Sequence, residues 1–404
     1  MVVEEVKYPA YRWVILFMGW LLFGLVLMNW YAVVPRAHDL IPGLDLTLAQ
    51  FSLIVTAPTL AAIFLSIPGG ILGDRFGIRR VIGLGGAICA VAGIMRMTAS
   101  NFGAMFFCQL GIGAALALTF PSLPKMVSIA FPPREVGVAT GLCLTGMGVG
   151  IAAILAIGAA FSTWQQSVLS VGIIMAVVTL LWLIFVRDAP ARGKHVAERV
   201  RAIESLAYNF KQRNSWLIGI AQFLIMGAFT TITGSLPHML VHVHEISPAI
   251  AGTISSVLIF AMVGGNVVGP VVSDRIGIRK PVFCVAMAVS AICVFFGWLT
   301  AINITTWVLF IIGGLSFGSG LSLILTFPVE LPEIGQKWAG GCTGIILAMG
   351  NAGGFITMPY IFTPVAYTNP TLGYAIIALF IGAAILPMLI VPETGARSKA
   401  GSWT

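Results

Sequence analysis

Two short charged segments recur in the sequence, each between two long apolar stretches. The first copy contains Gly70, Asp74, Arg75, Gly77 and Arg79. The second copy repeats the order half a chain later, with Asp274 and Arg275 in the corresponding places. A carboxylate can meet the positive N-terminal end of a neighbouring helix, and an arginine can pair with a nearby acid. We therefore expect these segments to act as a conformational gate; the alternative is that they only anchor the topology of the chain.

Uncharged polar side chains are the second group that could do chemistry, because the apolar stretches carry no carboxylate away from their ends. Hydroxyls, amides and aromatic edges can replace the hydration shell of a small anion or a neutral solute. The strongest ligand candidates are Asn29, Tyr31, Gln109 and Gln222, since an amide that faces lipid is costly. Lys125 is a further candidate, either as an anion ligand and gate or as an interfacial charge.

Arg96 lies near the end of an apolar stretch, and its simplest interpretation is a side chain that reaches the water interface. The alternative is an anion ligand. Arg36 and four histidines form a basic group that would concentrate anions. The histidines are His38, His238, His242 and His244. A metal site at these histidines is disfavoured because no cysteine or acidic partner is in register, and a protonation role is favoured over it.

The composition is that of an integral membrane protein. Of the 404 residues, 58% are hydrophobic and 9% are charged, and the mean hydropathy is +1.00. A bilayer core of roughly 30 Å needs about 20 apolar residues per helix, and the chain repeats stretches of that length. The 6 cysteines lie inside these stretches and read as small hydrophobic residues. The net charge of +8 comes from the polar joints, so it does not indicate a nucleic-acid partner.

Twelve apolar stretches are expected to form transmembrane helices. They span residues 13–35, 48–72, 80–99, 102–123, 136–160, 164–186, 215–238, 249–273, 281–301, 305–328, 338–364 and 370–391. The longest polar segment divides them six and six. We therefore predict an N-terminal bundle over 1–186, a cytoplasmic linker with a surface helix over 187–214, and a C-terminal bundle over 215–404.

The two bundles repeat one another. Leu118-Thr119-Phe120-Pro121 recurs as Leu325-Thr326-Phe327-Pro328 in the corresponding helix of the second half. Six helices separate the copies, so they run in the same direction and are related by an axis along the membrane normal. The stretches at 136–160 and 338–364 are rich in glycine, including Gly146, Gly150, Gly350 and Gly353. We expect these glycines to allow close contact with the opposite half.

All lysines and arginines except Arg36 and Arg96 fall in joints on one side of the predicted bundle. The positive-inside rule places that side, with both termini and both charged segments, in the cytoplasm.

The chain resembles the major facilitator superfamily over its whole length. Gly70, Leu72, Asp74, Arg75 and Gly77, followed by two arginines, match the signature that follows the second helix of that superfamily. The sequence departs from it at Ile78, where a basic residue is common, and at Pro270, where the second copy lacks its leading glycine.

The region from Pro121 to Gly141 resembles the cyanate-porter type, which implies small-anion transport. The run from Gly350 to Gly354 is similar to nitrate/nitrite porters, but those carry an arginine within helices 2 and 8 that is missing here. Nitrate is therefore disfavoured.

The resemblance implies a secondary active or facilitative carrier that works by alternating access. The absence of carboxylates from the helix cores disfavours a carboxylate-based proton cycle and a cationic substrate. We expect a monomer in the plasma membrane that carries a small anion or neutral solute, without a cofactor or a metal. The competing interpretation is a transporter-like sensor without net transport, against which the short termini argue. An enzyme is disfavoured, because no nucleophile, acid–base pair or metal set lies within the helices.

Overall fold

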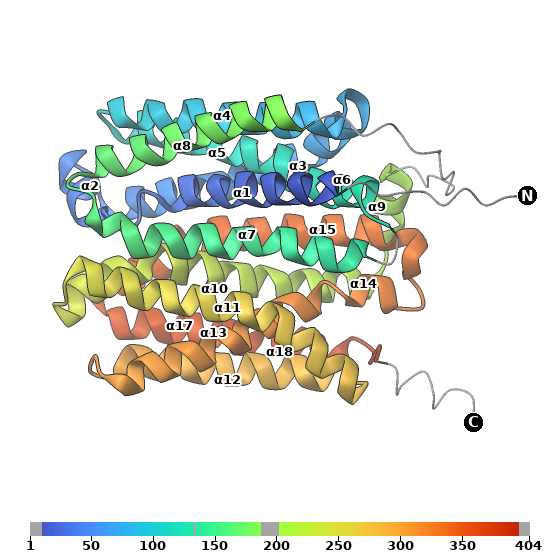
Figure 1. The fold of residues 1–404 in the computed structure, drawn as a ribbon. Coiled ribbons are helices and arrows are strands. Elements are labelled where there is room, and N and C mark those ends of the chain that lie inside the picture. The colour runs from blue at the N-terminus through green and yellow to red at the C-terminus, as the bar shows by residue number, and fades with distance from the viewer. Residues whose placement is uncertain (1–9, 133–134, 187–201, 396–404) are drawn as a thin grey trace, which may run out of the picture.

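The computed structural model describes residues 10–132, 135–186 and 202–395, and in these ranges the regular secondary structure is helical (Figure 1). Twelve of the described helical segments are long and apolar enough to cross a membrane, which confirms the expected number. Residues 187–201 of the predicted linker fall outside the described residues, and the predicted boundary at 214/215 falls in the first turn of the helix Arg213–His244, so the domain division stays a prediction. Gly70 and the side chains of Asp74 and Arg75 also fall outside the described part, although their backbone belongs to a helix.

The described residues of the first half form eight α-helices and two short 3-10 helices, Arg96–Thr98 and Gly158–Ala160. The α-helices are α1 Tyr11–Tyr31, α2 Ala37–Gly43, α3 Leu48–Phe76, α4 Ile78–Met95, α5 Phe102–Thr119, α6 Ser122–Ala130, α7 Val136–Ile157 and α8 Trp164–Phe185. The predicted first helix ended at residue 35, whereas the structure ends α1 at Tyr31 and places a separate short helix, α2, in the joint that follows.

The second half begins with the linker helix. Its helices are α9 Ala202–Phe210, α10 Arg213–His244, α11 Pro248–Ile276, α12 Lys280–Leu299, α13 Ile304–Ile324, α14 Phe327–Glu330, α15 Gly335–Ile356, α16 Thr363–Thr368, α17 Pro370–Ala383 and α18 Ile385–Ile390. A π-helical segment, Thr357–Phe362, connects α15 to α16. The predicted single helix over 338–364 is therefore a composite.

The repeated Leu-Thr-Phe-Pro sequence marks a break in both halves. Where one helix was expected over 102–123, α5 ends at Thr119 and α6 begins after Pro121. In the second copy, α13 ends before Leu325, and α14 has Pro328 in its first turn. Proline cannot donate the backbone hydrogen bond and its ring crowds the preceding turn, so the helix stops there in both copies.

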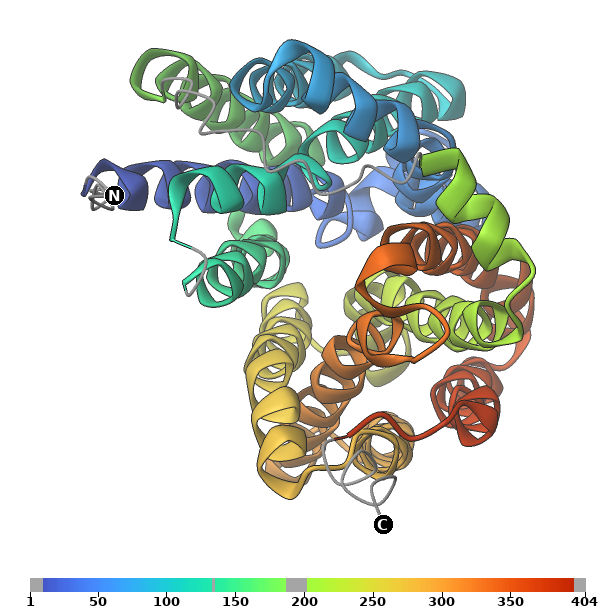
Figure 2. The same ribbon diagram turned by 90° about the vertical axis from the view of Figure 1, so that its right-hand side faces the viewer.

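The helices form two groups that lie side by side, α1 to α8 and α10 to α18 (Figures 1 and 2). Helices α9 and α14 lie at one end of the molecule and α2 lies at the opposite end. We call the first the basic end, since it carries the charged turns at 74–80 and 274–280. We call the second the histidine end, since it carries His38 and His238.

The two halves contact each other from the histidine end to the middle of the molecule. Helix α3 packs on α15, and α7 packs on α11. At the histidine end the Ser52 and Thr363 hydroxyl oxygens are 2.7 Å apart, and Ser256 Oγ donates to the Ala152 carbonyl at 2.8 Å. These contacts hold the halves together where α3 and α11 begin.

Nearer the basic end, the helices that face the other half have open space beside them. A Cβ atom at Gly141 of α7 or at Gly340 of α15 would meet no heavy atom within 4 Å. At Gly148, in the middle of α7, it would meet Val263 of α11. The described contacts therefore close the interface at the histidine end.

The prediction that the glycines of α7 and α15 face the opposite half is wrong for most of them. A Cβ at Gly150 would overlap the carbonyl oxygen of Gly24 on α1, and one at Gly353 would overlap that of Phe223 on α10. Helix α1 belongs to the same half as α7, and α10 belongs to the same half as α15. The glycines therefore let helices approach within each half, and each half is a tightly packed unit.

This packing predicts opposite effects for two glycine-to-alanine substitutions on α7. Gly150→Ala should destabilise the protein by about 1–3 kcal/mol, because the added methyl group forces α1 and α7 apart. Gly141→Ala is the matched control, and it should be neutral or stabilising by up to about 1 kcal/mol because alanine favours a helix. Thermal unfolding in detergent measures both. Equal melting temperatures for the two variants would contradict the assignment of Gly150 to a backbone contact.

Candidate functional site

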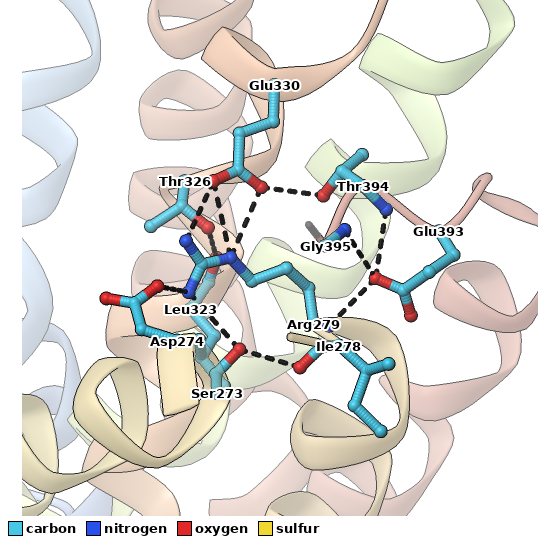
Figure 3. Close-up of polar contacts among 10 residues, drawn as sticks. All are labelled: Ser273, Asp274, Ile278, Arg279, Leu323, Thr326, Glu330, Glu393, Thr394 and Gly395. Carbon is cyan, nitrogen blue, oxygen red and sulfur yellow. Dashed lines mark hydrogen bonds and ion pairs between the residues drawn. The ribbon is translucent and has the colours of Figure 1, made fainter. Parts of the chain in front are cut away.

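The second charged turn is a closed network of ion pairs around Arg279 (Figure 3). The guanidinium Nη2 of Arg279 is 2.9 Å from Glu330 Oε1 of α14, and Nη1 is 2.6 Å from Asp274 Oδ1 of α11. These carboxylates raise the pKa of Arg279 further, the hydrogen bonds to Glu330 having the largest effect. Because the guanidinium pairs with acids on two helices, it fixes the turn between α11 and α12 against α14.

Glu393, after α18, binds the same turn through backbone groups. Its Oε1 accepts hydrogen bonds from the N–H groups of Arg279 and Gly395, both at 2.8 Å, and Oε2 accepts one from Lys280 N at 3.0 Å. Burial raises the pKa of Glu393, but the backbone donors outweigh it and the pKa lies below its ordinary value. Thr394 Oγ1 also donates to Glu330. The network therefore joins four segments of the second half.

The backbone conformation of the two charged turns explains why each contains a glycine, Gly77 in the first and Gly277 in the second. Their φ angles are +89° and +79°, a region that residues with a Cβ rarely adopt. In the first copy Arg79 donates to the Leu183 carbonyl, and Trp182 Nε1 donates to the Arg79 carbonyl at 3.0 Å. The described contacts of each turn thus stay within the half to which that turn belongs. The gating role of Gly70, Asp74, Arg75, Asp274 and Arg275 stays a prediction.

Arg96 is the centre of a second polar cluster, inside the first half. Its side chain is fully buried, so the interpretation that it reaches the water interface is wrong. Nη1 donates to the Asn29 carbonyl at 2.7 Å and to Gln109 Oε1 at 3.3 Å, and Nη2 donates to Asn29 Oδ1 at 3.0 Å. Its Nε makes no hydrogen bond to a described residue. Two of the predicted ligands, Asn29 and Gln109, thus bind this guanidinium.

The charge of Arg96 is solvated by dipoles. Asn29 and Trp30 belong to the last turn of α1, where the helix dipole is negative, and Gln109 Nε2 donates to the Trp30 carbonyl at 3.3 Å. Among the residues whose side chains the structure describes, Arg96 is the only Lys, Arg, Asp or Glu that is buried. A positive charge without a carboxylate partner therefore lies in the core of the first half.

The sequence contained a signal for this cluster. Asn29, Arg96 and Gln109 are isolated polar residues in three apolar stretches. Asn29 lies in the last turn of α1, Arg96 directly follows α4, and Gln109 lies in the first half of α5. Considered together they predict one buried network, whereas each considered alone suggested a ligand or an interfacial charge.

The other predicted ligands lie apart. The Tyr31 hydroxyl faces Thr233 of the second half and makes no direct hydrogen bond, so it belongs to the interface between the halves. Gln222 is buried against Gly350 of α15, and its Oε1 has no described partner. Lys125 is half-buried on α6 at the basic end. These residues do not form a single pocket, and their role as ligands stays a prediction.

At the histidine end a cavity of about 490 Å³ lies between the halves. His38 of α2 lines it from the first half, and His238 and His242 of α10 line it from the second. Arg36 is not free to bind an anion there, because it pairs with Asp39 and donates to the Ser162 carbonyl at 2.7 Å. No group of His, Cys, Asp and Glu suited to a metal ion occurs among the described residues.

The fold and these clusters define a polytopic carrier built from two similar halves. Residues 19–358 match the sequence profile of the Major Facilitator Superfamily, so the chain belongs to that superfamily, and it is a membrane transporter. The resemblance inferred from the charged turns is thereby confirmed.

Similar proteins carry transport names. A "Probable nitrate transporter" of Staphylococcus epidermidis is 25% identical over 371 residues, which cover 90% of this chain and 92% of the relative. The "Nitrite extrusion protein" of Bacillus subtilis is 23% identical over 338 residues, 81% of each chain. Among solved structures, a bacterial homolog of the human lysosomal transporter Spinster has a TM-score of 0.75 at 15% identity and covers 95% of this chain and 96% of its own. The last comparison supports the fold.

The Glu393 contacts predict that acid weakens the basic end of the second half. A carboxyl whose pKa is lowered by folding stabilises the protein above its unfolded pKa, near 4.5, and this contribution is lost as the pH falls through the folded pKa. Glu393→Gln should therefore lower the melting temperature at pH 7 and flatten its decline below about pH 4.5. Glu245→Gln, at the histidine end, is the control. An acid-sensitive profile unchanged in Glu393→Gln would contradict this role.

Proposed function

We propose that the chain transports a small monovalent anion across the bacterial plasma membrane by alternating access between its two halves. The supporting observation is Arg96, a buried cation that no described carboxylate neutralises. In a medium of low dielectric constant such a charge favours anions and repels cations over several ångströms. Trp30 and Gln109, which adjoin it, belong to helices α1 and α5, which line the path in carriers of this architecture.

The names of the relatives agree with an anion. A nitrate transporter and a nitrite extrusion protein are among them, and each matches this chain over most of its length. Residues 48–73 and 248–273 contain no arginine, which disfavours nitrate, but the names of the relatives keep it among the candidates. The single buried positive charge of Arg96 suits a solute with one negative charge better than a solute with two. Nitrite, nitrate and cyanate are therefore the solutes to compare.

The distribution of charge supports an orientation. In the sequence nearly all lysines and arginines fall in the joints that include the two charged turns, which by the positive-inside rule supports a cytoplasmic position for the basic end. The histidine end then faces outward, and the Ser52–Thr363 and Ser256–Ala152 contacts close the path on the outside. Each half is internally rigid, with glycine contacts and the Arg279 network. Transport then consists of the halves pivoting so that the outer contacts break and the basic ends approach.

Flux separates this proposal from the sensor alternative. Purified protein in liposomes should take up nitrite, nitrate or cyanate faster than protein-free liposomes, and an excess of a competing anion should slow that uptake. Guanidinium, a cation of comparable size, should not enter. Folded protein that moves none of the three anions, by net uptake or by exchange, would overturn the transport claim.

The role of Arg96 predicts the effect of cancelling its charge while an acceptor stays at position 109; the donations of Gln109 Nε2 to the Trp30 and Ile54 carbonyls are lost in this change. Gln109→Glu places a carboxylate against the guanidinium where Gln109 Oε1 now accepts a hydrogen bond at 3.3 Å. A unit charge that acts across roughly 10 Å at an effective dielectric constant of about 20 is worth about 1.7 kcal/mol, so cancelling it should lower anion uptake by about tenfold or more. Arg96→Lys keeps the charge and should retain more uptake than Gln109→Glu.

Gln166→Glu is the matched control for this change. Gln166 lies at the start of α8 and accepts a hydrogen bond from Ser162 N, which a glutamate can also accept. Its uptake should equal that of the unaltered protein. Uptake by folded Gln109→Glu protein at the unaltered rate would show that the Arg96 charge does not act on the solute.

A further inference from the structure

The cavity at the histidine end lies between the two halves. Its lining from the first half includes His38, Ile41 and Leu48, and its lining from the second includes His238 and His242. A smaller cavity of about 10 Å³, lined by Val34 and Pro237 among others, adjoins the same His38 and His238. Two histidines of the second half therefore face one of the first half across the closed outer interface. We call this cavity the histidine vestibule.

The imidazoles are close to one another and only partly satisfied. The ring centres of His238 and His242 are 4.4 Å apart, at an angle of 71°. His238 is 7% exposed and its Nδ1 has no hydrogen-bond partner in the described protein, whereas His242 lies at the exposed rim. A buried polar atom that the protein leaves unpartnered is available to a ligand. The aromatic ring of Phe51 on α3 packs 6.2 Å from the His238 ring.

The charged groups around the vestibule leave little negative charge to compensate protonated histidines. On the first-half side, Asp39 Oδ1 is 3.2 Å from His38 Nε2, and its other oxygen pairs with Arg36. The groups on α10 are the two imidazoles, and α16 contributes the exposed phenol of Tyr367. Arg36 and Asp39 cancel, so every proton bound by the three imidazoles adds net positive charge.

We propose that the histidine vestibule is a proton-dependent binding site for a small inorganic anion at the outer mouth of the carrier. Protonated imidazoles supply N–H donors from both halves and the positive charge that holds the anion. The carrier would then have an outer binding site for its solute, separate from the Arg96 cluster.

Proton binding also bears on the closed outer contacts. Burial, the largest effect, lowers the pKa of His38 below its ordinary value; Arg36 and His242 lower it too, and Asp39 opposes them. A base with a lowered pKa resists protonation in the closed arrangement. As the pH falls through the ordinary value of about 6.5, an arrangement in which the histidine is solvated becomes favoured. External acid should therefore favour separation of the outer ends, and the protonated imidazoles that line the opened mouth then bind the anion. Both effects make uptake faster at low external pH.

Binding can be measured without transport, which keeps this inference distinct from the proposed function on which it rests. Protein with ¹⁵N-labelled histidine in lipid nanodiscs is titrated by NMR in sodium nitrite and in sodium gluconate. An anion that binds the protonated site raises the apparent imidazole pKa by the logarithm of one plus its concentration over its Kd. Nitrite at ten times its Kd for that site should therefore raise the His38 pKa by about 1 unit. Superimposable titrations in nitrite up to about 1 M and in gluconate would overturn the proposal, since that concentration exceeds millimolar Kd values several hundredfold.

A substitution tests the same site in transport. The double variant His238→Gln/His242→Gln should abolish the nitrite-dependent pKa shift of His38. In the unaltered protein, uptake should rise about tenfold between external pH 7.5 and 5.5 when one protonation controls the rate, and the double variant should not show this rise. His244→Gln is the control, because His244 packs on Trp298, at 4.9 Å between ring centres, and does not line the cavity.

The outcomes separate the two proposals. Uptake that rises with external acid in the control and not in the double variant supports the vestibule. Uptake that rises equally in both, with both proteins folded by size-exclusion chromatography, overturns it and leaves the anion carrier intact. A nitrite-dependent pKa shift without uptake of any anion would instead support the site and overturn the carrier.

Discussion

The guanidinium of Arg96 imposes the strongest constraint on this molecule, because an ionised group buried in a membrane protein must be solvated by the protein itself. The end of α1 and the amide of Gln109 supply that solvation with dipoles, not with a carboxylate. Nη1 and Nη2 are hydrogen-bonded, Nε has no described partner, and no described carboxylate cancels the charge. The arrangement joins helices of the first half, and in the proposed mechanism its positive potential also acts on the solute.

The second half treats its main partly buried cation, Arg279, in the opposite way. Arg279 pairs with Glu330 and Asp274, and Glu393 binds the backbone of the same turn. That network is electrically compensated, so it acts as a clamp at the basic end. The repeat thus produced two similar folds with different electrostatics. One half carries a buried, uncompensated charge, which we propose selects the solute, and the other carries a compensated one.

Much of the fold could be predicted from the sequence, because the need for long apolar stretches is set by the bilayer. Apolar length gave twelve helices, and the repeated charged turns indicated two halves in one superfamily. Side-chain placement was harder to predict, since helix rotation decides it. Gly150 and Gly353 face helices of their own half. Arg96 is buried because polar partners from two other helices, α1 and α5, bind its guanidinium. Hydrogen-bond partners far apart in sequence leave no periodic pattern.

Alternating access requires the outer ends to separate, and a cross-link there tests it most directly. Ser52 and Thr363 lie on opposite halves with their hydroxyl oxygens 2.7 Å apart. In a Ser52→Cys/Thr363→Cys variant, with the native cysteines replaced by alanine, nitrite uptake into liposomes is measured before and after oxidation and again after reduction. The account predicts uptake that is lost on oxidation and restored on reduction. Uptake that persists at the same rate in fully cross-linked protein would contradict it.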